Sequence, residues 1–299
     1  MIKIPPYLKK GDTIGLTCPA GYLVKGKADN CIKTLQQWGF DVMVGKTLDG
    51  NSDNYFSGTD EQRLNELQAM LDDESINAIL CGRGGYGVGR IIDQLDFTKF
   101  KRKPKWIIGF SDITVLHAHL NSKIKVASLH APMAGAFNKE NEFVESLHKA
   151  LTGKKAKYTC AVDLFNTIGS ATGELIGGNL SLLVNAIGTP SDINTKNKIL
   201  FIEDIAEYVY GVDRMMYQLK RSGKLDQLKG LIIGGFSEMK DTERPFGKTV
   251  YEVIHDIVKD YDYPVCFNFP VGHETENYAL KEGCVYTLKV TKKIVTLSE

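Results

Sequence analysis

Residues 78–89 have the sequence Ala-Ile-Leu-Cys-Gly-Arg-Gly-Gly-Tyr-Gly-Val-Gly. The unbroken apolar run at its start is typical of a strand buried on both faces of a parallel sheet. The glycines that follow permit positive φ and leave backbone N–H groups open to a ligand. Five glycines in the eight residues 82–89 are more than a turn requires. The stretch therefore predicts an α/β fold in which a strand ends at a backbone-lined site for an oxyanion.

Two other interpretations of these glycines stay open. Gly82, Gly84 and Gly87 fit the G-x-G-x-x-G pattern of dinucleotide-binding folds. In such folds the pattern follows the first strand, with an acid about 20 residues further on. Here it follows the third predicted strand, and the next strand ends without such an acid. A dinucleotide-binding enzyme is thus an alternative, and a tight turn without a ligand is another.

Strands and helices alternate on both sides of this stretch. In the first half we expect helices at 28–38, 60–71, 87–95 and 112–121 and strands at 13–17, 40–44, 78–81 and 106–110. In the second half we expect helices at 179–187, 212–221 and 247–259 and strands at 199–202, 230–233, 264–268 and 285–290. The alternation predicts a Rossmann-like domain at 1–150, a crossover linker at 151–172 and a smaller α/β domain at 173–299.

Charge and composition argue against several classes of partner. The chain has 299 residues, 37 basic and 36 acidic, for a net charge of +1, which argues against nucleic-acid and anionic-membrane binding. No apolar run approaches the roughly 18 residues of a membrane helix, and the first residues do not resemble a secretory signal. The six cysteines form no Cys-x-x-Cys pair. We therefore expect a cytoplasmic protein with free, mostly buried thiols.

A serine lies where the strand at 106–110 meets the next predicted helix. The sequence there is Gly109-Phe110-Ser111-Asp112. A serine at a sharp strand-to-helix turn is the geometry of a nucleophile elbow, in which the helix N-terminus stabilises developing negative charge. The usual G-x-S-x-G pattern is absent, and serine commonly caps helices. On this motif alone, capping is the more frequent role of Ser111.

A carboxylate and a histidine follow two later strands. Glu203 and Asp204 end the strand at 199–202, and His273 lies in a loop after the strand at 264–268. Sites form at the carboxyl ends of strands in open α/β sheets. Ser111, Glu203 and His273 would make a workable triad, in which histidine takes the serine proton and the carboxylate fixes its tautomer. His130 is the other histidine predicted at a loop edge.

Five blocks in order give the chain a family resemblance. They are Gly-Arg-Gly-Gly-Tyr-Gly at 82–87, Ile-Gly-Phe-Ser-Asp at 108–112, Gly-Glu-Leu-Ile-Gly-Gly-Asn-Leu at 173–180, Leu-Phe-Ile-Glu-Asp at 200–204 and Pro-Val-Gly-His at 270–273. Together they resemble the murein LD-carboxypeptidase family of serine peptidases, which also includes the microcin C self-immunity peptidases. The resemblance extends from about residue 11 to about residue 288.

The resemblance implies a fold and a set of roles. The N-terminal domain would be similar to class I glutamine amidotransferases and provide the nucleophile, Ser111. The C-terminal domain, β-rich α/β, would provide His273 as general base and Glu203 to orient it. The backbone N–H groups of Gly85 and Asp112 would form the oxyanion hole. Tyr86 and Asn179 are candidate substrate-binding residues by position alone.

The resemblance also implies an activity. Members release the terminal D-Ala of murein tetrapeptides by cleaving an L-to-D peptide bond through an acyl-enzyme, in the cytoplasm during cell-wall recycling. They need no metal or cofactor, and many are homodimers. Microcin-type members stack a nucleotide-like group on an aromatic residue, often Trp, whereas this chain has only Trp38 and Trp106. A microcin-type hydrolase is therefore a disfavoured alternative, and a non-catalytic peptide binder is a further one.

Overall fold

Two sheets form the framework of the molecule, a computed structural model that describes residues 2–48, 54–137 and 141–299. Within these residues the first sheet has six strands in the order β11-β5-β4-β3-β1-β2. All its pairs are parallel except β11 with β5. Its strands are β1 (Thr13–Thr17), β2 (Asp41–Val44), β3 (Ile76–Cys81), β4 (Trp106–Gly109), β5 (Ser128–His130) and β11 (Leu280–Glu282).

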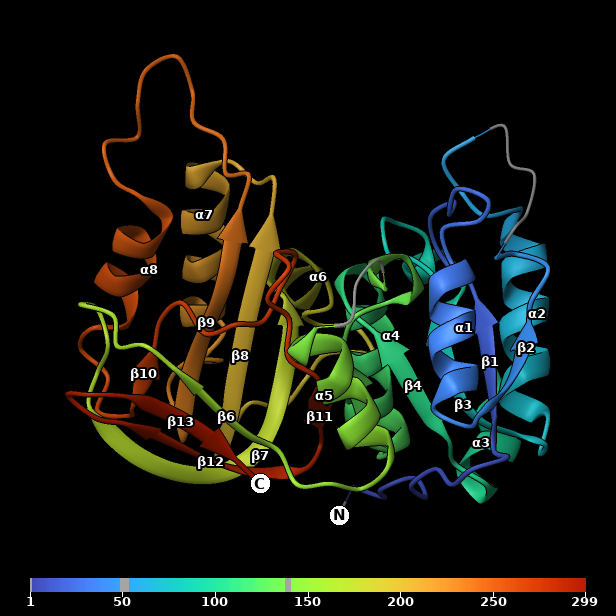
Figure 1. Cartoon of the computed structure of the whole chain (residues 1–299). Helices are drawn as coiled ribbons and strands as arrows, with labels where there is room; N and C mark the ends of the chain where they lie inside the picture. Colours follow the sequence, from blue (N-terminus) through green and yellow to red (C-terminus); the bar gives the residue numbers. More distant parts are fainter. Residues whose placement is uncertain (1, 49–53, 138–140) are drawn as a thin grey trace.

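The second sheet has seven strands in the described residues, in the order β10-β9-β8-β7-β12-β13-β6. The first four are parallel to one another, and the remaining pairs are antiparallel. Its strands are β6 (Lys157–Cys160), β7 (Gly169–Asn179), β8 (Lys198–Ile205), β9 (Gly230–Ser237), β10 (Val265–Cys266), β12 (Val285–Val290) and β13 (Val295–Ser298). Figure 1 shows the two sheets side by side.

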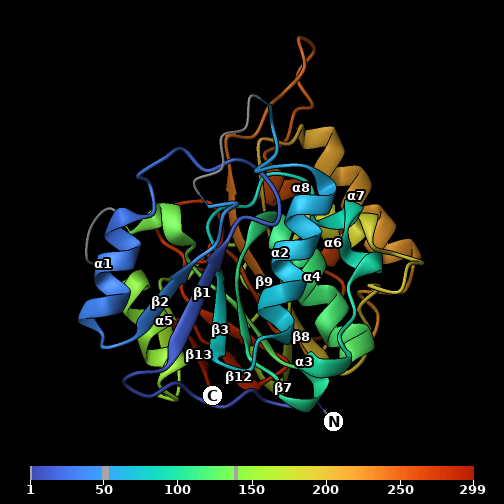
Figure 2. The ribbon, with the colours of Figure 1, turned by 90° about the vertical axis from the view of Figure 1, so that its right-hand side faces the viewer.

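Helices cover both faces of the first sheet, with α1 on one side and α2 on the other (Figure 2). The N-terminus of α2 is set by a capping box, in which Thr59 and Gln62 satisfy each other's backbone N–H groups. The helices are α1 (Asp29–Gln37), α2 (Asp60–Asp72), α3 (Thr98–Arg102), α4 (Thr114–His119), α5 (Glu142–Leu151), α6 (Leu180–Asn185), α7 (Val209–Arg221) and α8 (Val250–Val258). The mixed α/β class predicted from the sequence is thereby confirmed.

Short β11 connects the end of the chain to the first sheet. It pairs Leu280 with His130 and Glu282 with Ser128. One core cluster joins residues of both sheets, for example Ile108 and Leu129 with Phe201 and Leu288. The site between the sheets is therefore built on a shared apolar core, which limits the freedom of one sheet to move against the other.

The predicted linker contains regular structure. Residues 151–172 include the last residue of α5, all of β6 and the start of β7. The division into 1–150 and 173–299 remains a prediction.

The two outer strands of the second sheet approach each other. Thr167, just before β7, makes two backbone hydrogen bonds with Val265 of β10. Cys160 of β6 and Cys266 of β10 lie with their sulfur atoms 3.8 Å apart. These strands stand at opposite ends of the strand order, so the sheet curves until its edges meet.

This curvature predicts a specific cross-link. Because the two sulfur atoms are already in contact, a disulfide of about 2 Å requires only a small side-chain movement. Treatment of the folded protein with diamide is expected to remove two hydrogen atoms per chain and to join the peptides containing Cys160 and Cys266, as peptide mass mapping would show. Cys160→Ser should abolish the cross-link and Cys284→Ser should retain it. A cross-link formed only after unfolding would contradict the curved sheet.

Candidate active site

Ser111 stands at the sharp turn between β4 and α4. Its φ is +61°, a left-handed conformation that a non-glycine residue rarely adopts. A short 3-10 turn over Ser111–Ile113 leads into α4. Among the described residues the Ser111 hydroxyl has no hydrogen-bond partner, so it does not cap the helix. A strained backbone and a free hydroxyl at a strand end are the features of a nucleophile elbow.

The glycine loop after β3 lies directly against this serine. A Cβ at Gly84 would come within 2.8 Å of Ser111 Cβ and 3.2 Å of the Asp112 nitrogen. The Gly84 carbonyl accepts a hydrogen bond from the Gly21 N–H, 2.9 Å. Gly85 has a φ of +94°, and in the described part of the chain its N–H has no partner. The loop therefore brings an unused backbone donor close to the elbow.

The Asp112 carboxylate joins the elbow to the loop. It is buried and accepts a hydrogen bond from the Val88 N–H, 2.8 Å. Burial raises the pKa of Asp112 to about 6, against the lowering effect of the hydrogen bond from Val88 and the charge of Arg63. Asp112 thus has a positioning role through its side chain, separate from the one expected of its backbone N–H.

The helix predicted at 87–95 is not an α-helix. Two 3-10 turns replace it, Val88–Arg90 and Ile92–Gln94. The Val88 N–H, which would begin a helix, is bonded to Asp112 instead. The loop consequently lacks the long helix whose N-terminus binds a pyrophosphate in dinucleotide folds, and this weakens the dinucleotide alternative.

Glu203 and His273 form a close pair. His273 Nδ1 lies 2.6 Å from Glu203 Oε2, and the Glu203 side chain is fully buried near the end of β8. Gly272 permits this approach, because its φ is +139° and a Cβ there would come within 3.2 Å of Glu203 Cβ. If Nδ1–H donates to the carboxylate, Nε2 is left without a proton and can act as a base.

His273 also lies next to the elbow. Its ring packs edge-on against Phe110, the neighbour of Ser111, with centroids 4.9 Å apart. Phe110 and His273 line the same cleft of about 580 Å³. No hydrogen bond joins the Ser111 hydroxyl to His273, and such catalytic bonds are often long before substrate binds. The structure therefore places the Glu203–His273 pair against Phe110, the residue that precedes Ser111, and His273 and Phe110 border one cleft.

His130 has a different place. It is fully buried, and its Nε2 lies 3.1 Å from Asn277 Oδ1. The same Asn277 oxygen accepts a hydrogen bond from the Gly272 N–H, 3.2 Å. Burial lowers the pKa of His130 to about 3, so it is neutral at physiological pH. It supports the loop that holds His273 and is not exposed to a ligand.

Opposing effects act on the pKa of His273. Burial disfavours the imidazolium, whereas the hydrogen bond and charge of Glu203 favour it, together with the charges of Asp204 and Glu238. The acidic groups outweigh burial, so the pKa of His273 lies above its ordinary value. A carboxylate that stabilises the imidazolium is what a general base of this kind requires.

A pH profile would measure this balance. Because His273 must be neutral to accept a proton, the acid limb of kcat/KM is expected to have its midpoint above the ordinary histidine value of about 6.5. In Glu203→Gln the carboxylate charge is lost while burial remains, so the midpoint should move to lower pH as the rate falls. Glu243→Gln, on an exposed loop, should leave the midpoint unchanged. An acid limb that is identical in Glu203→Gln and the parent protein would contradict this assignment.

Of the two residues predicted to bind substrate, Tyr86 is exposed, whereas Asn179 is buried and hydrogen-bonded to other residues of the protein. Tyr86 is 52% exposed and packs against Phe56. The Asn179 amide donates to Asp204 Oδ1, 2.8 Å, and accepts from the Ser181 hydroxyl and the Leu182 N–H. Asn179 thus caps α6 and positions Asp204, which its helix-starting position in the sequence could have indicated.

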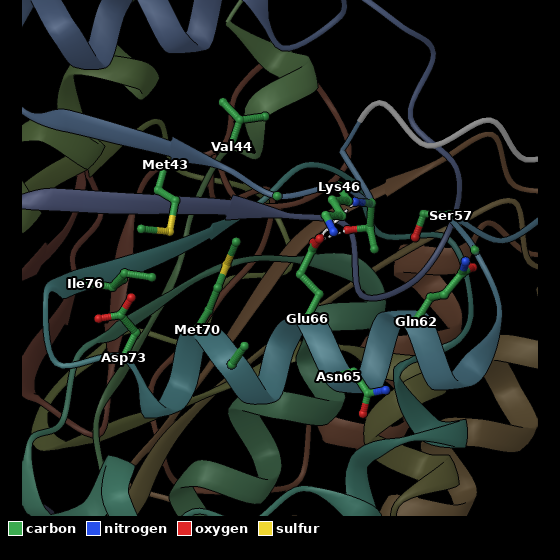
Figure 3. A pocket seen from close by; sticks show the side chains of 14 residues that line it. Met43, Val44, Lys46, Ser57, Gln62, Asn65, Glu66, Met70, Asp73 and Ile76 are labelled. Carbon is green, nitrogen blue, oxygen red and sulfur yellow. Dashed lines mark hydrogen bonds between the residues drawn. The ribbon is translucent and has the colours of Figure 1, made fainter.

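A second cavity of about 620 Å³ lies away from these residues, between β2 and α2 (Figure 3). Glu66 and Asp73 are its acidic residues, and Glu66 accepts hydrogen bonds from the hydroxyls of Thr17 and Thr47 and from the Thr47 N–H. These bonds hold β1, α2 and the segment after β2 together. None of the residues predicted to be functional lines this cavity.

Family models match most of the chain. The LD-carboxypeptidase N-terminal domain matches residues 14–131, and the LD-carboxypeptidase C-terminal domain matches residues 172–288. The chain belongs to the LD-carboxypeptidase family. The family resemblance predicted from the five sequence blocks is therefore confirmed.

Relatives with names and solved structures agree with this membership. A Bacillus subtilis protein named "Probable murein peptide carboxypeptidase" is 33% identical over 98% of this chain and 93% of its own length. The crystal structure of muramoyltetrapeptide carboxypeptidase from Oxalobacter formigenes has a TM-score of 0.86 and 27% identity, over 96% of this chain and 98% of that one. The microcin C7 self-immunity protein MccF, in complex with aspartyl sulfamoyl adenosine, has a TM-score of 0.87 and 25% identity, over 100% and 98%.

Two structural features are absent from the described part of this LD-carboxypeptidase family member. In residues 2–48, 54–137 and 141–299, no helix has the length and apolar character needed to cross a membrane. Within the same ranges, no group of three or more His, Cys, Asp or Glu side chains is arranged to hold a metal ion.

Proposed function

We propose that this protein is a serine carboxypeptidase that releases the terminal D-Ala of murein tetrapeptides by cleaving an L-to-D peptide bond. The observation that supports this most strongly is the Glu203–His273 pair beside a strained, unbonded Ser111. Names of relatives point to the same substrate class, since they include murein peptide and muramoyltetrapeptide carboxypeptidases. We further propose that the protein is a cytoplasmic homodimer that acts in cell-wall recycling.

The geometry supports a two-step mechanism. Ser111 Oγ attacks the scissile carbonyl carbon while His273 Nε2 takes its proton, and Glu203 stabilises the imidazolium. The N–H groups of Gly85 and Asp112 stabilise the oxyanion. His273 then protonates the leaving amine, so D-Ala departs and the peptide remains as an ester on Ser111. Water activated by His273 hydrolyses that ester and restores the free hydroxyl.

Ser111 belongs to the first sheet's side of the molecule, and Glu203 belongs to the second sheet. If residues 1–150 and 173–299 are the two domains, neither domain holds a complete triad. We therefore expect neither half to hydrolyse peptides alone.

A substrate panel tests the proposed function. The protein is incubated with a murein tetrapeptide ending in D-Ala, with the same peptide ending in L-Ala, and with an aminoacyl sulfamoyl adenosine. Mass spectrometry is expected to show loss of one alanine from the first peptide alone. Cleavage of only the sulfamoyl adenosine would favour the microcin-type alternative. Neither tryptophan faces the candidate site, because Trp38 stacks on His148 and Trp106 is fully buried, and this observation disfavours that alternative.

Two other outcomes would replace the proposal altogether. Micromolar binding of NAD or NADP in equilibrium dialysis, without cleavage of any peptide, would favour the dinucleotide alternative. Binding of the tetrapeptide without turnover would favour the non-catalytic peptide binder.

A further inference from the structure

A second cleft adjoins the candidate site on the other side of Phe110. It has a volume of about 350 Å³ and shares Phe110 and Ala136 with the cleft that contains His273. The remaining residues that line it are Leu23, Val24, Lys27, Gly82, Arg83, Met133 and Gly135. Because Phe110 precedes Ser111 and Arg83 precedes Gly84, this cleft begins where the glycine loop meets the elbow.

The two clefts differ in charge. Lys27 and Arg83 line the second cleft, and no acidic residue lines it. The first cleft is lined by Glu274 and by no lysine or arginine, and the charge of Glu238 also acts on His273. The charges that line the two clefts therefore favour an anion in the second cleft over the first.

A hydrogen bond orients the Arg83 side chain, but no carboxylate among the described residues neutralises its charge. Its Nη1 donates to the Tyr22 carbonyl, 2.6 Å. Across the residues that the structure describes, no carboxylate lies within 4 Å of Arg83 or Lys27, in contrast to the paired Arg63 and Arg90. The remaining guanidinium donors of Arg83 are in the fixed fork that matches a carboxylate.

The rest of the cleft is apolar. Leu23 and Met133 are buried side chains in its wall. The Leu23 side chain packs close to both Gly82 and Gly135, where a Cβ would lie within 3.4 Å of it. Such a wall suits a small methyl group and has few polar atoms to bind a larger polar side chain.

We propose that the Lys27–Arg83 cleft binds the free C-terminal carboxylate of the peptide, with Leu23 and Met133 receiving the small side chain of the terminal residue. This inference rests on the proposed function and names the group by which the site recognises a chain end. The leaving residue then lies across Phe110, which borders both clefts. Its amine points towards His273 and its carboxylate points towards Arg83. The arrangement restricts cleavage to the last peptide bond, because an internal bond would place an uncharged amide between the two cations.

The test compares two forms of one substrate. A murein tetrapeptide with a free C-terminal carboxylate is compared with the same peptide bearing a C-terminal carboxamide, and kcat/KM is measured for each. The parent protein is expected to prefer the carboxylate by about 100-fold, in line with a charge-assisted bidentate contact. In Arg83→Leu and in Lys27→Met this preference should fall towards unity, mainly through KM for the carboxylate form. Arg83→Lys should keep part of it.

Controls separate this inference from the proposed function. Lys25→Met, another exposed lysine two residues from Lys27 and outside the cleft, should retain the full preference. If the carboxylate preference is unchanged in both Arg83→Leu and Lys27→Met, the cleft assignment is wrong although the peptidase assignment stands. If the parent protein releases no D-Ala, the proposed function itself fails. Should Arg83→Leu not fold, as judged by circular dichroism, Lys27→Met alone decides between these outcomes.

Discussion

Replacement of His273 by alanine is expected to lower kcat by roughly 10⁴–10⁶-fold, with the protein still folded. The physical reason is that Ser111 Oγ is a weak nucleophile unless a base removes its proton in the transition state. Among the described histidines, His273 is the one that pairs with a buried carboxylate and borders the cleft beside Phe110. Steady-state release of D-Ala from a murein tetrapeptide would measure the loss.

A double variant that combines Ser111→Ala with His273→Ala tests this expectation more strictly. Because Ser111 and His273 act as one unit, adding Ser111→Ala to His273→Ala should lower the residual rate little further. Independent roles would instead multiply the two losses. His148→Ala is a suitable control, since His148 stacks on Trp38 and is not in the candidate site. A His273→Ala protein with a rate within tenfold of the parent would contradict its role as general base.

Gly84→Ala is expected to lower kcat/KM by about 100-fold or more. The new methyl group would come within 2.8 Å of Ser111 Cβ and 3.0 Å of Ser111 Oγ, closer than side chains approach one another. Either the nucleophile or the loop that presents the Gly85 N–H must move, and a displacement of about 1 Å can cost 100-fold in rate. The measurement is kcat/KM for D-Ala release, with a thermal melt to verify folding.

Gly89→Ala provides the matched control in the same loop. No atom lies within 4 Å of a Cβ at Gly89, and its φ is not positive. We expect Gly89→Ala to retain the parent kcat/KM. If Gly84→Ala and Gly89→Ala were equally active, the close contact between the glycine loop and Ser111 would not matter for catalysis.

Local sequence signals were sufficient to predict the strand ends. The apolar runs at 78–81, 106–110 and 199–202 correspond to β3, β4 and part of β8, because fully buried parallel strands need side chains that are apolar on both faces. Since the carboxyl ends of such strands are where sites form, Ser111 and Glu203 could be singled out from position. The positive φ of Ser111 and the absence of a capping hydrogen bond from its hydroxyl could not be predicted from the sequence and are seen only in the structure.

Contacts between distant parts of the chain explain what the sequence did not predict. The segment after the glycine loop forms 3-10 turns because Asp112, 24 residues later, bonds to the Val88 N–H. The three residues of β11 join the first sheet through pairing with β5, about 150 residues away. Neither pairing leaves a periodic pattern in the local sequence.

The hydrogen bonds of Asn179 are visible only in the structure. It was a substrate-binding candidate by position alone, and its amide is bonded to Asp204, Ser181 and Leu182; substrate binding by Asn179 remains a prediction. The sequence does not single out the two cations that line the second cleft. Lys27 and Arg83 are 56 positions apart and exposed, and only the fold places both beside Phe110.

The most direct test of the central claim is the release of D-Ala from a murein tetrapeptide by Ser111→Ala, whose folding is first verified by circular dichroism. The parent protein is expected to convert the tetrapeptide to the tripeptide, and Ser111→Ala to release no D-Ala above the uncatalysed background under the same conditions, because no other described hydroxyl stands at the elbow beside Gly84. Turnover by folded Ser111→Ala at a rate near that of the parent would contradict the assignment of Ser111 as the nucleophile.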